Sequence, residues 1–589
     1  MPNLVAAGDV TATSAVLWAR ATVTGPVRFE YGLSQSFAAG STESMSVDVV
    51  DRTVPAKVEI GGLSPGSLYF YRATDAEGAA SSGRFRTPAL EGRNGLRFGV
   101  SGDWRGDLAP YPSVGNVPDR GLDLFVALGD TIYADVPSPD VPISQCATIE
   151  DFRAKHNEVY SERAGLNTLA ALRASTAVLA MIDDHEVTND FAGGAPPSMG
   201  SIFAGEMVDF VHDTAVFTAG TQAFHEFNPI RTEFYGDTGD PRTSGKMKLY
   251  RARNYGLDAA FFMLDARTFR DEELPTIGAT AAQSVVEDFL RRSFDAARTM
   301  LGRAQIEELK DDLLAASAAG VTWKFVLVPE PIQNLGPSLA SDRFEGYAAE
   351  RTELLRFIDE NAIANVVFIA ADIHGTVVNN LTYQLDCGGP QLYTKAWEIT
   401  TGSVAYAAPF GPTVASYVDE DSLGPAAGLF QLVYGLADRA GRDGIVTFAS
   451  QLLLGGYGLD AVGLDFSPID ARLTKGGYVA VNTFGWTEFE IDAESQCLAV
   501  STWGIDWYDG SDLAGRREEV LARTPQIVSQ FIVRPEGSRV LVCPNPSANE
   551  GGAFSQCGCG VLFPIPFIFL GMTGISRKSS RRWSGRSSE

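Results

Sequence analysis

The sequence predicts a multidomain protein in which a small N-terminal β-sandwich precedes a much larger α/β domain. Three observations lead to this fold class. The 589 residues are enough for two or more domains and a large buried core. Residues 1–88 contain short segments of alternating apolar and polar side chains, whereas residues 95–535 contain apolar segments separated by helix-like stretches. A content of 45% apolar and 20% charged residues is typical of a folded chain.

The N-terminal segment is expected to be all-β. Strand-like alternation occurs in Ser14–Arg20, Val27–Tyr31 and Ser67–Arg72, and turn residues such as those of Gly62–Gly66 separate the strands. About seven short strands over this length are typical of an immunoglobulin-like or fibronectin-type-III-like sandwich. No residue in this segment has a catalytic pattern, so we expect a spacer or binding role.

The second domain contains six apolar segments with the length and composition of buried strands. They are Leu96–Ser101, Leu124–Leu128, Val178–Ile182, Ala260–Leu264, Lys324–Val328 and Asn365–Ala370. Helix-like stretches such as Gly302–Ala319 and Tyr347–Asn361 lie between them. This alternation predicts an α/β core in which polar residues at the carboxyl ends of the strands meet at one edge of the sheet.

Residues 405–465 are rich in Gly and Ala and contain few charges. They form either an insertion or lid over that edge, or ordinary packing. Strand alternation returns in Gly477–Val481 and Trp486–Ile491, so the second domain is expected to close near residue 535.

The charge of the chain limits its partners. The 73 acidic residues exceed the 47 basic ones, which gives a net charge of −26. Such a chain repels nucleic-acid backbones, so we expect no binding to nucleic-acid duplexes. Any phosphate site must therefore neutralise charge locally, with metal ions or arginines.

The cysteines and the two ends of the chain bear on its location. Six dispersed cysteines form no CxxC pair, which argues against a thiolate zinc site and leaves disulfides open for an exported protein. No signal peptide is present in the sequence as given. In the tail, residues 536–589, Cys557 and Cys559 precede an apolar run, Val561–Leu570, and a basic end. This layout resembles bacterial C-terminal sorting tails; the alternative is a disordered tail. We expect a secreted, periplasmic or cell-surface bacterial protein, with membrane attachment through the tail as one option.

Metal-competent side chains follow four of the apolar strands. In chain order they are Asp103, then Asp130 and Tyr133, then Asp184, His185 and Glu186, then Asp372 and His374. Oxygen-rich sets with one or two imidazoles suit Ca²⁺, Mn²⁺, Fe³⁺ or Zn²⁺. A central carboxylate such as Asp130 can bridge two metals about 3.5–4 Å apart. Taken singly, these residues have structural explanations (a turn, a helix cap, a hydrogen-bonded core cluster). Four strand ends in succession favour a metal site.

These motifs resemble those of the PhoD-type alkaline phosphatases and phosphodiesterases. The resemblance rests on Gly129–Tyr133, Asp183–Asn189 and Asp372–His374, which match the successive motifs of that family. Leu264–Arg270, Glu345–Arg351 and the N-terminal Ala7–Arg20 are also similar to family segments. The similarity extends roughly from residue 1 to residue 500.

The resemblance implies a four-layer α/β core of the calcineurin-like metallophosphoesterase type, and hydrolysis of phosphate monoesters or diesters at alkaline pH. It implies that Asp130, Tyr133 and Asp372 are metal ligands and that Asn189 contacts the second cation or the phosphate. Asp184, His185 and His374 would be ligands or acids that face the phosphate.

One position departs from the family pattern. The family places a cysteine ligand after the first strand, where this chain has Ser101–Trp104. Asp103 can replace the cysteine as an oxygen ligand. The family's two ions, Ca²⁺ and Fe³⁺, are therefore in doubt, and Mn²⁺ or Zn²⁺ are alternatives.

The resulting hypothesis is that a metal-bound hydroxide attacks the phosphorus of a small phosphate ester. Arg105 or Arg267 could clamp the phosphate, because a guanidinium matches phosphate oxygens. The alternative for each arginine is a solvated or ion-paired role. His185 or His374 could protonate the leaving group. A monomer is expected.

Two other functions stay open. A catalytically degenerate surface or adhesion protein is slightly favoured by the missing cysteine and by the long 405–465 segment. A phospholipase acting on lipid phosphodiesters would fit an apolar lid in 405–465.

Overall fold

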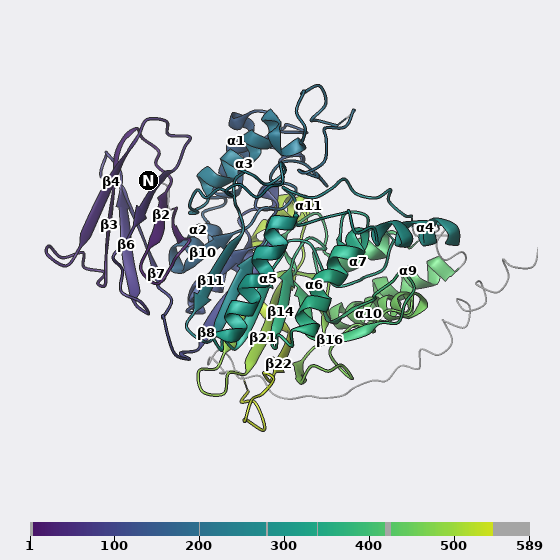
Figure 1. The fold of residues 1–589 in the computed structure, drawn as a ribbon. Coiled ribbons are helices and arrows are strands. Elements are labelled where there is room, and N and C mark those ends of the chain that lie inside the picture. The colour runs from purple at the N-terminus through teal and green to yellow at the C-terminus, as the bar shows by residue number, and fades with distance from the viewer. Residues whose placement is uncertain (1–3, 200, 279–280, 339, 419–425, 546–589) are drawn as a thin grey trace, which may run out of the picture.

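The computed structural model describes residues 4–199, 201–278, 281–338, 340–418 and 426–545. Two large β-sheets pack against each other in the core, and helices cover their outer faces (Figure 1). A smaller sheet near the N-terminus stands beside this core.

The larger sheet has eleven strands within the described residues and crosses the boundary between the two predicted domains. Its order is β18-β22-β21-β20-β8-β9-β10-β1-β2-β5, and β17 pairs with β8 beside this path. The strands are β1 Val5–Gly8, β2 Ala15–Ala19, β5 Ala56–Ile60, β8 Leu96–Trp104, β9 Leu124–Ala127, β10 Ala177–Ala180, β17 Ser403–Ala405, β18 Ala471–Lys475, β20 Thr483–Ile491, β21 Leu498–Asp506 and β22 Gln526–Val533.

The second sheet has seven strands in the described part of the chain, in the order β11-β12-β13-β14-β16-β15-β19. Its strands are β11 Arg251–Tyr255, β12 Ala259–Met263, β13 Trp323–Leu327, β14 Val366–Ala370, β15 Thr376–Tyr383, β16 Leu392–Thr400 and β19 Val479–Ala480. All six apolar segments that the sequence predicts as core strands are strands in one of these two sheets.

The N-terminal sandwich shares a sheet with the core. Its second sheet has the order β4-β3-β6-β7, with β3 Gly25–Gly32, β4 Glu43–Val49, β6 Leu68–Thr74 and β7 Ala80–Arg86. Facing it are β1, β2 and β5, and β1 also pairs in parallel with β10 of the core, Ala7 beside Ala177. The wholly buried, uncharged β1 carries none of the charges that protect a free edge strand, and β10 covers that edge.

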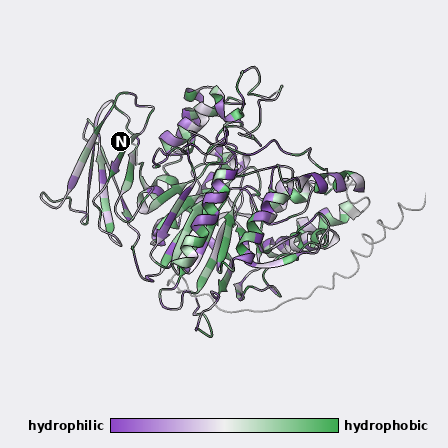
Figure 2. Ribbon diagram, in the orientation of Figure 1, coloured by the Kyte–Doolittle hydropathy of each residue, from purple (hydrophilic) through white to green (hydrophobic). Residues whose placement is uncertain are grey.

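Helices on both outer faces complete four layers. On the larger sheet lie α1 Ile149–Val159, α2 Thr168–Ser175 and α3 Ala215–Phe227, which pack against Phe125 and Val178. On the smaller sheet lie α5 Arg303–Ala318 and α6 Ala348–Glu360, which pack against Phe262 and Phe368. The core strands are mostly green in Figure 2, as expected for strands covered on both faces.

Phenylalanine rings fill the space between the two sheets. The Phe98 ring centroid lies 4.9 Å from those of Phe261 and Phe325 in the smaller sheet. It also lies 4.7 Å from Phe489 in its own sheet. Burial of this apolar surface holds the carboxyl ends of the strands in both sheets in a fixed relation.

The expectation that the four acidic strand ends meet at the edge of one sheet is wrong in one respect. Strands β8, β9 and β10 are parallel neighbours in the larger sheet. Strand β14 lies in the smaller sheet, between β13 and β16. The candidate site is therefore built from the ends of two packed sheets. An apolar strand pattern shows that a strand is buried, but it does not show which sheet the strand joins.

The remaining described segments lie around the core. Residues 405–465 contain α7 Phe410–Ser416, α9 Ala426–Leu436 and α10 Arg439–Gly456; elsewhere lie α4 Gln283–Ser293, α11 Gly510–Gly515 and α12 Arg517–Leu521. Cys497 and Cys543 form a disulfide. None of the helices in the described ranges is long and apolar enough to span a bilayer. The predicted sorting motif with Cys557 and Cys559 lies outside the described residues.

Candidate metal centre

The backbone at the strand ends adopts an unusual conformation. Asp103, Asp130, Asp372 and His374 have φ angles of 60°, 50°, 61° and 57°. Residues other than glycine rarely occupy this left-handed region, because their Cβ atoms crowd the backbone there. Such conformations occur at functional sites, where the surrounding structure enforces them. Four of the seven residues that the sequence predicts as metal ligands share this feature.

Gly129 allows the loop after β9 to approach the loop after β10. Its φ angle is 101°, and a Cβ atom at this position would lie 2.5 Å from the Cβ atom of Asp183. The carbonyl oxygen of Asp130 accepts a hydrogen bond of 2.8 Å from the backbone N–H of Trp104. The Gly-Asp pair thus places Asp130 between the ends of β8 and β10.

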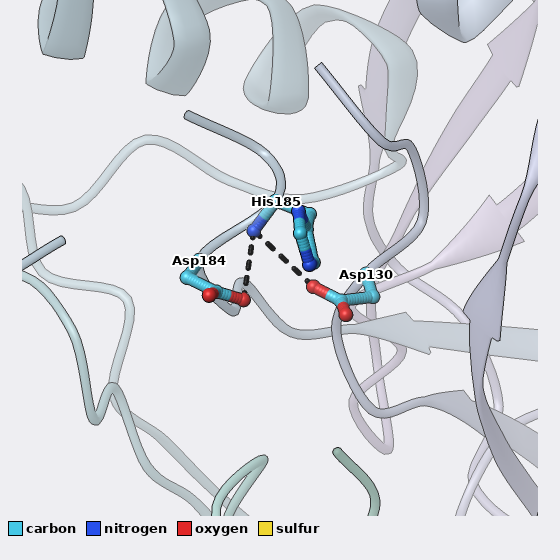
Figure 3. A group of neighbouring side chains, drawn as sticks. All are labelled: Asp130, Asp184 and His185. Atoms are coloured by element: carbon cyan, nitrogen blue, oxygen red, sulfur yellow. Dashed lines mark hydrogen bonds between the residues drawn. The ribbon is translucent and has the colours of Figure 1, made fainter. Parts of the chain in front are cut away.

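Asp130, Asp184 and His185 form the first cluster, which we call the Asp130 cluster (Figure 3). Each residue is buried, and each offers one ligand atom within 4.8 Å of the others. The backbone N–H of His185 donates to Oδ1 of Asp184 at 2.9 Å and to Oδ1 of Asp130 at 3.3 Å. These bonds hold both carboxylates toward the same point.

Asp103 and Tyr133 bring further oxygen atoms to this region. Both side chains are buried. Within the described part of the chain, the two carboxylate oxygens of Asp103 and the hydroxyl of Tyr133 have no hydrogen-bond partner. His374 Nε2 lies 3.4 Å from Asp103 Oδ1, and the Tyr133 and His185 rings are 4.3 Å apart. Buried oxygens without partners are costly, and a bound cation would satisfy them. The donor set therefore fits a metal ion.

Two further carboxylates, Glu186 and Asp135, support the Asp130 cluster. Glu186 is fully buried and accepts hydrogen bonds from Thr131 N and Thr131 Oγ1, both at 2.6 Å, and from Asp183 N at 2.9 Å. Asp135 Oδ1 lies 2.6 Å from His185 Nδ1. An imidazole held at Nδ1 presents Nε2 to a ligand or a substrate, as in many metal sites.

Glu330, Asp342 and Asp372 form a second group, the Glu330 cluster, whose ligand atoms also lie within 4.8 Å of one another. Arginines neutralise this group. Arg267 contacts Glu330, and Arg270 Nη1 lies 3.2 Å from Glu330 Oε1. One oxygen of Glu330, Oε2, is buried and has no hydrogen-bond partner among the described residues.

Burial and like charges affect the protonation of these carboxylates. Burial, followed by Asp184 and Asp183, raises the pKa of Asp130 well above its usual value. Burial and Asp342 do the same to the pKa of Asp372. Burial raises the pKa of Asp183 to about 7, although Arg267 opposes the shift. Without a cation these groups favour their protonated forms, so metal binding and proton release are coupled.

Two predicted site residues have surroundings different from those expected. Arg267 has no exposed surface, and its Nε lies 2.6 Å from Asp183 Oδ1 while its Nη2 lies 3.7 Å from Asp184 Oδ1. These contacts match the ion-paired alternative for Arg267. The expectation that it clamps a substrate phosphate stays a prediction. Arg105 is 22% exposed and paired with Asp107 at 2.8 Å and 3.2 Å.

Asn189 and His374 lie at the margin of the candidate metal centre. Asn189 is exposed; its side chain donates to Asp190 at 2.6 Å, and its backbone N–H donates to Asp135 at 2.9 Å. The His374 ring stacks on Tyr406 with a centroid distance of 3.8 Å. The ligand roles predicted for these residues stay predictions.

Four residues of the site were not singled out from the sequence: Asp135, Glu330, Asp342 and Tyr406. Asp135 lies two residues after Tyr133, and Glu330 follows β13 as Asp130 follows β9, so a search of every strand end would have found both. Asp342 and Tyr406 lie in loops whose position no local pattern indicates.

Comparison with known proteins identifies the family. The model for the PhoD-like phosphatase family matches residues 102–425, and the model for the PhoD-like phosphatase N-terminal domain matches residues 1–89. The first match covers more than half of the chain. The chain belongs to the PhoD-like phosphatase family. This confirms the resemblance that the strand-end motifs indicated, and it supports the predicted enzyme class, a phosphoric ester hydrolase.

Two individual PhoD proteins are similar to the chain. It is 26% identical to alkaline phosphatase D of Bacillus subtilis (strain 168) over 408 residues, which are 64% of this chain and 65% of the relative. The solved structure of PhoD matches with a TM-score of 0.64 at 19% identity, covering 91% of this chain and 92% of that one. The structural match confirms the predicted fold class, an N-terminal β-domain followed by an α/β core.

Proposed function

We propose that this member of the PhoD-like phosphatase family hydrolyses phosphate esters at a two-metal site. The observation that carries the proposal is the convergence of Asp130, Asp184 and His185 from two strand ends. Beside them lie Asp103 and Tyr133, whose buried side-chain oxygens have no hydrogen-bond partner in the described chain. Family membership supports the reaction class.

Asp103, Asp130, Tyr133, Asp184 and Asp372 would hold the cations, together with a histidine from His185 or His374. Bound cations lower the pKa of a coordinated water and offset the negative charge of the phosphoryl group. In a chain with a net charge of −26, this local positive charge is what admits an anionic substrate.

The protein's own residues provide position and proton transfer. Asp135 orients the His185 ring, and Tyr406 packs on the His374 ring, so each imidazole has a defined direction. Either histidine could donate a proton to the leaving oxygen. Arg105 is the more exposed of the two arginines predicted to contact a phosphate, and it would have to exchange Asp107 for the substrate.

The identity of the ions is part of the proposal. An oxygen-rich set with one or two imidazoles fits Ca²⁺, and Tyr133 offers a phenolate of the kind that favours Fe³⁺. Because Asp103 stands where the family's cysteine is expected, Mn²⁺ and Zn²⁺ are alternatives.

The test is hydrolysis of a chromogenic phosphodiester and the matching monoester at about pH 8–10. The protein is first chelated, and Ca²⁺, Mn²⁺, Fe³⁺ or Zn²⁺ is then restored singly and in pairs. Turnover that depends on restored metal is the expected result, and the ratio of diester to monoester rates gives the preference. Folded protein that is silent with every metal would instead support a degenerate core used for binding.

Hydrolysis of lipid phosphodiesters is a second candidate, favoured by apolar residues exposed on α9 and α10.

We also propose that the chain acts outside the cytoplasm, because the Cys497–Cys543 disulfide suits an oxidising compartment. A monomer, no binding to nucleic-acid duplexes and attachment through the C-terminal tail complete the proposal.

A further inference from the structure

Aliphatic side chains are exposed along α9 and α10. On α9, Leu429, Leu432 and Leu436 are 43%, 57% and 79% exposed, and on α10 Leu452 and Leu453 are 47% and 43% exposed. The spacing of three and four residues places the α9 leucines on one side of the helix. With Val433 these residues form what we call the α9–α10 apolar surface.

The α9 part of this surface is free of charge in a protein that is otherwise strongly acidic, whereas α10 begins with Arg439, Arg442 and Asp443. Helix α9 contains no Asp, Glu, Lys or Arg from Ala426 to Leu436, and it is mostly white to green in Figure 2. Single exposed leucines are ordinary on soluble proteins, whereas a group on neighbouring helices indicates an interaction site. The absence of charge favours an uncharged apolar partner over a charged peptide.

The opposite sides of the two helices are anchored next to the candidate metal centre. Tyr434, Val446 and Leu454 pack in one buried cluster with Ile373, which lies between Asp372 and His374. Tyr434 also donates a hydrogen bond of 2.6 Å to Asn482. The helices are therefore fixed to the segment that presents the last two predicted ligands.

The exposed surface also borders the loop that carries the Glu330 cluster. A Cβ atom at Gly336 would lie 3.4 Å from Leu453 Cδ2, and Gly336 lies between Glu330 and Asp342 in sequence. A partner bound at Leu453 would thus lie beside Gly336, in the segment that joins Glu330 to Asp342.

We propose that the α9–α10 apolar surface binds the surface of a lipid bilayer and so brings the candidate metal centre to phosphodiester headgroups. Leucine-rich helix faces of this kind enter the boundary between headgroups and acyl chains. That these headgroups are substrates rests on the proposed function; the lipid contact itself does not. The sequence after residue 545 adds a separate argument, because the apolar run Val561–Leu570 has a composition that suits the same lipid surface.

The experiment measures flotation of the purified full-length chain with phosphatidylcholine vesicles. Zwitterionic lipid is chosen because a net charge of −26 opposes binding to anionic vesicles. The variant L432Q/L436Q/L452Q should reduce the partition coefficient at least about tenfold, and L436Q alone should reduce it less. The control L33Q/V50Q/L90Q changes three equally exposed apolar residues of the N-terminal segment and should bind as the wild type does.

Hydrolysis of a soluble chromogenic ester by the same proteins tests the proposed function separately and should be equal in all of them. The proposed lipid surface is overturned if L432Q/L436Q/L452Q floats as the wild type does, or if the wild type does not float. Loss of flotation only in the tail variant F563Q/F567Q/F569Q assigns binding to the tail instead. A wild-type dimer that L432Q/L436Q/L452Q dissociates, with no vesicle binding, assigns the surface to a second copy of the chain.

Discussion

Two groups of carboxylates lie near the ends of the two sheets, and they differ in what neutralises them. The Glu330 cluster is surrounded by arginines of the same chain, with Arg267 and Arg270 in contact with Glu330. The Asp130 cluster adjoins Asp103 and Tyr133, whose buried side-chain oxygens have no hydrogen-bond partner in the described residues. Arginine charge thus neutralises the first group, whereas in the second it reaches Asp184 alone, from Arg267 Nη2 at 3.7 Å. The other carboxylates of the second group would be neutralised by a bound cation.

This difference separates stability from chemistry. Carboxylates paired with buried arginines hold the two sheets together, and removal of one partner leaves an uncompensated charge. In the Asp130 cluster an arginine lies near Asp184 alone, with Arg267 Nη2 3.7 Å from Asp184 Oδ1. Within the described residues Asp130 forms no ion pair with an arginine, so its carboxylate can bind a cation. We therefore expect substitutions in the two groups to have different effects.

The largest effect is expected for Asp130→Asn, which keeps the shape of the side chain and removes its charge. Metal bound after dialysis should be lost, and turnover should fall by about 10³-fold or more, equivalent to ~4 kcal/mol of transition-state stabilisation. Elemental analysis and ester hydrolysis measure the two quantities. The exposed Asp119→Asn is the control and should change neither. An Asp130→Asn protein with full metal content and full activity would remove the basis for the comparison.

Arg267→Met should act mainly on stability. It leaves Asp183 without its buried partner and Glu330 with Arg270 alone, which should cost about 3–5 kcal/mol in the free energy of unfolding. Denaturant unfolding measures this, and Arg105→Met, which breaks a partly exposed pair, should cost no more than about 1 kcal/mol.

The double variant Arg267→Met/Glu330→Gln sharpens this result, because it removes both charges of the contact and should recover part of the loss. A raised KM with unchanged stability would instead support the role of Arg267 as a phosphate clamp.

The sequence predicted the strands and ligands because both leave local patterns. The apolar segments before Asp103, Asp130 and Asp372 have strand length and end in polar residues, and each became a strand of the core. The contacts of Arg267 could not be predicted from the sequence. The Asp-x-Arg segment that contains it has the same local pattern whether the guanidinium contacts a substrate or a carboxylate of the protein. Which sheet takes β14 depends on long-range pairing, which periodicity does not encode.

The stability of the metal-free protein should depend on pH through two buried groups of the candidate metal centre, Asp183 and His185. Burial raises the pKa of Asp183 to about 7, and Asp184 and Asp135 outweigh burial and raise the pKa of His185 to about 9. A raised folded-state pKa gives stability that is present at low pH and is lost as the pH rises through the folded value. The chelated protein should therefore lose stability between about pH 5 and pH 9, by up to ~1.4 kcal/mol per pH unit for each such group.

Restored metal should reverse that loss, because the cation replaces the protons. The increase in Tm on adding metal should be larger at about pH 9 than at about pH 5. Groups remote from the site titrate equally with and without metal, so their effect on Tm does not enter this difference. In Asp130→Asn the increase should be small at both pH values. A metal effect independent of pH would show that the carboxylates are already ionised without a cation.

The smallest effect is expected for Tyr406, which touches the Asp130 side of the site and not the arginine network. Its ring stacks on His374 at 3.8 Å and lies 5.1 Å from the ring of Tyr133. Tyr406→Ala should reduce cation affinity by about fivefold, since such ring contacts contribute ~1 kcal/mol. Tyr406→Phe keeps both contacts and should bind metal as the wild type does, by calorimetric titration of the chelated protein. If Phe and Ala lose affinity equally, the hydroxyl and not the ring is the active part of Tyr406, and the Asp130 side gains a further oxygen ligand.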